Sequence, residues 1–95
     1  MHARVVRFTG VSDERMAELG NRIEGGEGAP PGVEASSVQI YHDPAQETAV
    51  VVVEFESEEK MRAADEAFAQ MDPSETPGSR ASVDLCAVVA DVTLD

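Results

Sequence analysis

The chain has 95 residues, of which 19 are acidic and 7 are Lys or Arg, so its formal net charge at pH 7 is −12. This charge argues against nucleic acid and anionic membranes as partners, because both are bound through clusters of basic residues. With 42% hydrophobic residues the chain is too apolar for a disordered acidic tail, and its length suits a single domain over residues 1–95.

The first predicted strand runs from Ala3 to Thr9, because its side chains alternate in character. Arg4 lies on the same side as two apolar residues, Val6 and Phe8, whereas Arg7 lies on the other side with Val5. Alternation with a period of two is typical of a strand in which one face packs on a core.

A helix is predicted to follow, because Ser12 is a favourable N-cap and two acidic residues stand in the first turn. Met16, Leu19 and Ile23 then recur at helical spacing, and the glycines that begin the stretch 25–32 (GGEGAPPG) end the helix. This stretch is predicted to be a loop. It does not resemble a phosphate-binding loop, because it follows a helix and lacks the Lys-Ser/Thr ending.

The second half of the chain predicts two strands, a helix and a final strand. The strands run from Ala35 to His42 and from Thr48 to Glu56, with a turn at Asp43-Pro44 between them. Ser57 caps the second helix, and the stretch from Ala81 to Leu94 forms a long last strand that we expect to be bent or bulged. The apolar stripe of the second helix comprises Met61, Ala64, Phe68 and Met71.

The resulting order β-α-β-β-α-β predicts an α+β fold of the ferredoxin-like type, with a four-stranded antiparallel sheet and two helices on one face. Right-handed crossovers place the strands in the order 4-1-3-2. The uncovered face should be polar in a monomer, yet residues 50–53 are four consecutive valines and 85–89 are apolar throughout. We therefore expect a homodimer formed through the open sheet face.

Two sequence passages carry a family resemblance. These are Pro31-Gly32-Val33, entering the second strand, and residues 51–59, in which Phe55-x-Ser57-x-Glu59 leads from the third strand into the second helix. Through them the chain resembles the dimeric α+β barrel superfamily, especially its antibiotic-biosynthesis-monooxygenase-like members. The resemblance implies two sheets packed back to back in a dimer, with a small pocket between sheet and helices in each subunit.

Four polar residues are candidates for that pocket: Arg7, Gln39, Tyr41 and His42. His42 is either a general base or a surface histidine beside the Asp43 turn. Gln39 and Tyr41 share one face of their strand, where they either orient an aromatic substrate or contact the second subunit. Arg7 either binds an acidic or phenolate ligand at the pocket mouth or belongs to an ion-pair set.

That ion-pair set would join Arg4 and Arg7 to carboxylates on the neighbouring strands, because buried arginines need partners. The carboxylates available on the third and fourth strands are Glu54, Glu56, Asp84 and Asp91. The set of Met16, Met61, Met71 and Phe68 is interpreted as core, with an adaptable apolar pocket as the alternative.

Two functions stay open at this stage. The resemblance implies a cofactor-independent monooxygenase acting on a small aromatic or polyketide-like compound. The alternative is a non-catalytic module that binds a small apolar or aromatic ligand, which is favoured by the absence of Trp from the chain and of His from residues 58–72. The lone Cys86 excludes an intrachain disulfide. We expect a cytoplasmic protein with no cofactor and no metal site.

Overall fold

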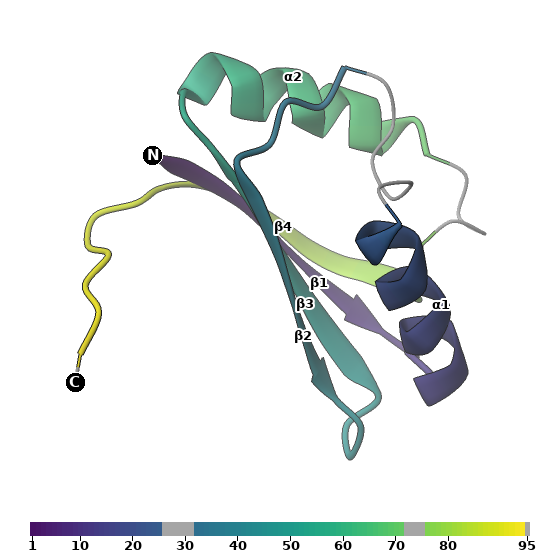
Figure 1. The fold of residues 1–95 in the computed structure, drawn as a ribbon. Coiled ribbons are helices and arrows are strands. Elements are labelled where there is room, and N and C mark those ends of the chain that lie inside the picture. Colours follow the sequence, from purple (N-terminus) through teal and green to yellow (C-terminus); the bar gives the residue numbers. More distant parts are fainter. Residues whose placement is uncertain (26–31, 72–75, 95) are drawn as a thin grey trace.

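The structure is a computed structural model that describes residues 1–25, 32–71 and 76–94 (Figure 1). Its helices and strands occur in the predicted order. They are β1 (His2–Thr9), α1 (Asp13–Glu24), β2 (Ser37–Asp43), β3 (Thr48–Phe55), α2 (Glu58–Ala69) and β4 (Ser79–Ala87).

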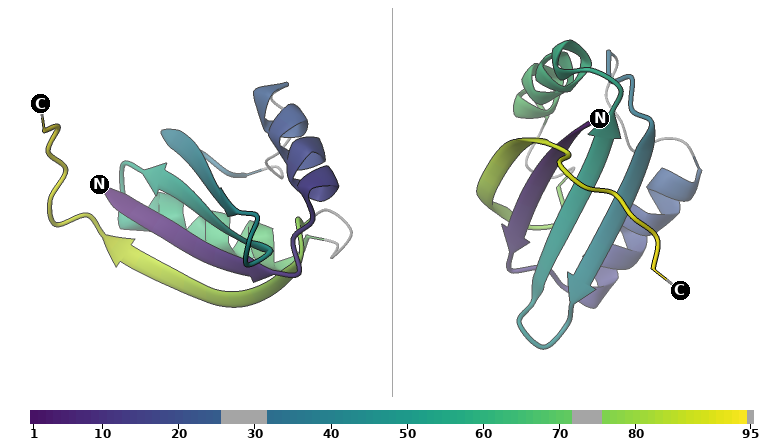
Figure 2. Two further views of the ribbon diagram at one scale, coloured as in Figure 1. Left: turned by 90° about the horizontal axis from the view of Figure 1, so that it is seen from below. Right: turned by 90° about the vertical axis from the view of Figure 1, so that its left-hand side faces the viewer.

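The strands form one antiparallel sheet in the order β2-β3-β1-β4, which confirms the predicted order and the ferredoxin-like arrangement. Both helices lie on the same side of this sheet, and the described residues place no helix on the other side (Figure 2). Residues 88–94 leave the end of β4 and run past this open side.

The register of β1 against β3 decides which residues face the helices. Val6 pairs with Val51 and Arg4 with Val53, so these four side chains point toward the same face, and Arg7 and Val52 point to the opposite one. The core lies on the helix side in two clusters of buried residues. One comprises Val6, Phe8, Val11 and Ala49, and the other comprises Val53, Phe55, Met61 and Ala64.

Each helix begins where the sequence predicts it. The hydroxyl of Ser12 accepts a hydrogen bond from the backbone N–H of Arg15, and the hydroxyl of Ser57 accepts one from Lys60, both at 3.2 Å. These bonds satisfy N–H groups that have no partner within the helix. The predicted loop at 25–32 lies largely outside the described residues.

The prediction for the last strand is wrong at its C-terminal end, because β4 stops at Ala87 rather than Leu94. β4 is an edge strand whose neighbour in the sheet is β1, and β1 begins at His2, opposite Ala87. One further bond follows, from the N–H of Val88 to the carbonyl of Met1 at 3.0 Å. Beyond this bond, the described residues offer β4 no further strand pairing. The expected irregularity does occur, as a register shift of β4 opposite Arg7 and Phe8.

Candidate functional site

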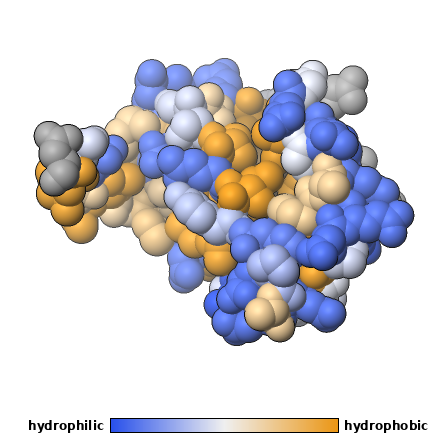
Figure 3. Space-filling model, turned by 60° about the horizontal axis from the view of Figure 1, so that its bottom comes forward, coloured by the Kyte–Doolittle hydropathy of each residue, from blue (hydrophilic) through white to orange (hydrophobic). Residues whose placement is uncertain are grey.

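A cavity of about 190 Å³ lies between α1 and the sheet, and we refer to it as the helix–sheet cavity. Apolar residues gather in a hollow near the centre of the molecule in Figure 3, where the surrounding surface is hydrophilic. The residues that line the cavity come from all four strands, both helices and the segments between them. They are Arg4, Val6, Phe8, Leu19, Ile23, Val33, Ala35, Val38, Val51, Val53, Phe68, Met71, Pro77 and Arg80.

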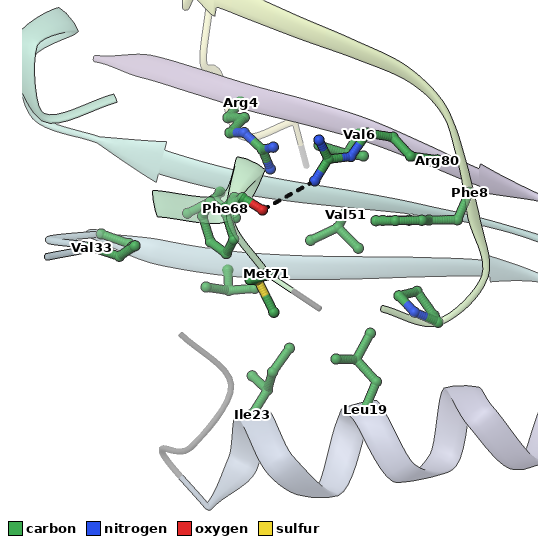
Figure 4. A pocket seen from close by; sticks show the side chains of 14 residues that line it. Arg4, Val6, Phe8, Leu19, Ile23, Val33, Val51, Phe68, Met71 and Arg80 are labelled. Atoms are coloured by element: carbon green, nitrogen blue, oxygen red, sulfur yellow. Dashed lines mark hydrogen bonds between the residues drawn. The ribbon is translucent and has the colours of Figure 1, made fainter. Parts of the chain in front are cut away.

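The cavity is present because α1 packs loosely against the sheet. Leu19 and Ile23 project from α1 toward the strands (Figure 4), but no residue of this helix is buried. Met61 and Ala64 of α2 are, in contrast, fully packed in the core. Phe68 and Met71, farther along the same stripe, are half-buried and line the cavity. The stripe of the second helix therefore divides between core and cavity wall, so both interpretations of it hold for part of its length.

Arg4 is the most unusual side chain in the wall, since it is a charged residue only 3% exposed. Its Nε donates to Oδ1 of Asp65 on α2 at 2.9 Å, and its guanidinium carbon lies 4.6 Å from the centre of the Phe68 ring. Its Nη2 is buried and has no acceptor within the described parts of the chain. An arginine has five N–H donors, and a buried donor without an acceptor destabilises the fold.

The charge of Arg4 is only partly compensated. Burial lowers the pKa of Arg4 below its ordinary value, whereas the hydrogen bond and the charge of Asp65 act in the opposite direction. The positive charge of Arg80 has the smallest effect and lowers the same pKa further. Arg80 also lines the cavity, and its Nη2 donates to the backbone carbonyl of Phe68 at 3.4 Å.

The four candidates from the sequence do not form one site. Arg7, Gln39 and Tyr41 lie on the open face of the sheet, and none of them lines the helix–sheet cavity. The structure does bring Gln39 and Tyr41 together, because the Tyr41 hydroxyl donates to Oε1 of Gln39 at 3.3 Å. Arg7 is exposed on β1, on the face opposite the cavity rather than at its mouth.

His42 lies apart from the other three candidates, on the helix side of β2. Its Nε2 is 3.9 Å from a carboxylate oxygen of Asp13, at the start of α1, and has no hydrogen-bond partner in the described residues. His42 does not line the cavity, so it cannot serve as a base for a molecule bound there.

The ion-pair prediction is wrong for Arg4. Its partner is Asp65 of the second helix rather than a strand carboxylate, because Arg4 points toward the helices and not along the sheet. Of the expected strand partners, Glu56 pairs instead with Lys60 at 3.6 Å. The sequence did contain a signal for this placement, since Arg4 shares its side of β1 with the apolar Val6 and Phe8, and such residues face the core.

The open face bears a mixture of polar and apolar side chains. Val50 and Val52 are half-buried there, and Cys86 of β4 lies on the same face, opposite Ala3 of β1. The described parts of the chain hold no group of three His, Cys, Asp or Glu side chains that could bind a metal ion. Neither α1 nor α2, the helices of the described residues, has the length and apolar character needed to cross a membrane.

No protein family model, curated protein or solved structure matches this chain.

Proposed function

We propose that this protein binds a small apolar or aromatic molecule in the helix–sheet cavity. The observation that supports this is a cavity of about 190 Å³ with a mainly apolar wall. An apolar cavity of about 150 Å³ is large enough to bind benzene. A ligand would also supply the packing that α1 lacks, because Leu19 and Ile23 face the cavity.

Between the two functions left open by the sequence, binding without catalysis is the better supported. The titratable side chains among the described lining residues are Arg4 and Arg80, and an arginine does not accept a proton at neutral pH. A monooxygenase that activates an aromatic substrate by deprotonation would need a base within reach of it. Oxygen uptake with a panel of hydroquinones is therefore expected to stay at the rate without protein, and clear turnover would favour the enzyme.

The binding proposal is tested by titrating the methyl-labelled protein with toluene and following its methyl NMR signals. We expect the signals of Leu19, Ile23 and Val51 to shift. Val50 and Val52 provide an internal control, because they lie on β3 but point to the open face. Shifts confined to the open-face valines would contradict the proposal.

A matched pair of variants adds a second control. Leu19→Trp is expected to fill the cavity and abolish the toluene shifts of the other lining residues. Ala17→Trp changes an exposed residue on the same helix and should leave them unchanged. If both variants bind toluene equally well, the molecule binds elsewhere.

The proposal extends to membership of the dimeric α+β barrel superfamily, with a second copy of the chain covering the open face. Its support is the exposed apolar surface on that side. Val89 and Leu94 beyond β4 are 95% and 88% exposed, and Tyr41 on β2 is 58% exposed. Surface of this kind is characteristic of interfaces.

Light scattering tests this extension. We expect twice the mass of the 10.1 kDa chain, and the mass of one chain for Val52→Lys, which places a charge in the middle of the open face. Ala17→Lys, on the exposed side of α1, should not change the mass. A wild-type protein with the mass of one chain contradicts the dimer and leaves the cavity proposal untouched.

A further inference from the structure

Two positive charges meet in the wall of the helix–sheet cavity. Arg4 and Arg80 are its charged residues among the described ones, and the other lining residues are apolar (Figure 4). The whole chain has 7 Lys and Arg residues against 19 acidic ones, so two arginines at one apolar cavity are a strong local departure from its overall charge. Apolar packing alone gives no reason for a guanidinium group at this place.

One hydrogen-bond donor of the buried Arg4 side chain lacks an acceptor among the described residues. Asp65 occupies Nε, and the Phe68 ring stacks against the guanidinium plane, but Nη2 has no acceptor among the described residues. Because Nη2 is buried, bulk water at the surface does not supply the missing acceptor. Arg4 also lines the helix–sheet cavity, so a molecule bound there contacts this side chain.

The charges of the described residues at the cavity indicate the sign of the charge that a ligand would carry. Arg4 and Arg80 each carry one positive charge, and Asp65 carries one negative charge that is hydrogen-bonded to Arg4. Among the described residues, these two arginines therefore outnumber by one the carboxylates that pair with them. A single negative charge would balance this excess, and it would relieve the repulsion between the two guanidinium groups.

We propose that the ligand of the helix–sheet cavity is a small organic monoanion, namely a compact, mainly aromatic carboxylic acid. Its carboxylate pairs with the guanidinium groups of Arg4 and Arg80, and its apolar body contacts the α1 side of the cavity. Planar guanidinium groups are well matched to carboxylates, because they offer parallel N–H donors. This inference rests on the proposed function of the cavity and adds the chemical class of the ligand.

The test compares phenylacetate with phenylacetamide, which has nearly the same shape but no charge. Calorimetric and NMR titrations of the full chain at low salt should show the acid binding at least about tenfold more tightly, as expected for a charge-assisted contact. Equal binding of the two probes overturns the monoanion inference and leaves the proposed binding function standing. If neither probe shifts the signals of the lining residues and toluene does not either, both proposals are wrong.

Three variants locate the effect. Arg80→Gln and Arg4→Met are each expected to weaken phenylacetate binding about tenfold while leaving phenylacetamide binding unchanged. Arg7→Gln is the matched control, because it removes the same charge from the same strand as Arg4 but on the opposite face. If Arg7→Gln weakens phenylacetate binding as much as Arg80→Gln does, the preference is a long-range effect of net charge and the inference fails. Arg80 is exposed, so its variant decides the question even where Arg4→Met does not fold.

Discussion

The two helices of this protein are built alike and packed differently. α1 and α2 each have 12 residues, a serine N-cap and two acidic residues in the first turn. α2 buries Met61 and Ala64 against the sheet, whereas α1 buries no residue at all. The helix–sheet cavity lies beneath the poorly packed helix. An apolar stripe therefore predicts which side of a helix faces the sheet, but not whether that side packs closely against other residues.

The largest expected difference between the two helices is the loss of stability when a side chain that faces the sheet is truncated. Met61→Ala should lower the free energy of unfolding by about 2–5 kcal/mol, because it leaves a void among fully buried neighbours. Leu19→Ala should cost only about 1 kcal/mol, because Leu19 is half-buried and already borders a cavity. Urea unfolding of both variants measures the difference. Equal losses would mean that α1 packs as firmly as α2 in solution.

A smaller effect is expected at the N-caps. Ser57→Ala should lower the free energy of unfolding by about 1 kcal/mol, since an N–H at the start of a well-packed helix loses its acceptor. Ser12→Ala removes the same contact from α1. Its effect should appear mainly as faster amide hydrogen exchange within α1, because a helix with few buried contacts opens without global unfolding. If Ser12→Ala lowers global stability as much as Ser57→Ala, the two helices belong to the same cooperative unit.

Most of the fold could be predicted from the sequence, because its signals are local. Alternating residues in β1 and serine caps at 12 and 57 place the elements, and chirality then fixes the order of the strands. The end of β4 could not be predicted in this way. Residues 88–94 look like a strand, but pairing needs a neighbouring strand, and β1 extends only as far as His2. The end of an edge strand is set by its partner rather than by its own residues.

The candidate site was harder to predict, because it depends on distances between elements. The period-two pattern separates Arg4 from Arg7 correctly, but that Arg4 lines a cavity depends on the gap beneath α1. The width of that gap depends on how far α1 lies from the sheet and on how far its side chains reach. No local sequence pattern encodes this distance. The pairing of Arg4 with Asp65 spans 61 positions in the chain, which also lies beyond local reasoning.

The single thiol of the chain has a practical consequence. Cys86 is half-buried and lies on the sheet face opposite the helix–sheet cavity. The rate at which it reacts with a small alkylating reagent, compared with a bulky one, reports steric access to that face in the unmodified protein. Because the chain has one cysteine, the reaction has one product, which intact-mass spectrometry follows without separation of isomers. The two proposals, ligand binding in the cavity and burial of the open face in a dimer, can thus be tested independently in one sample, the first by NMR and the second by alkylation kinetics.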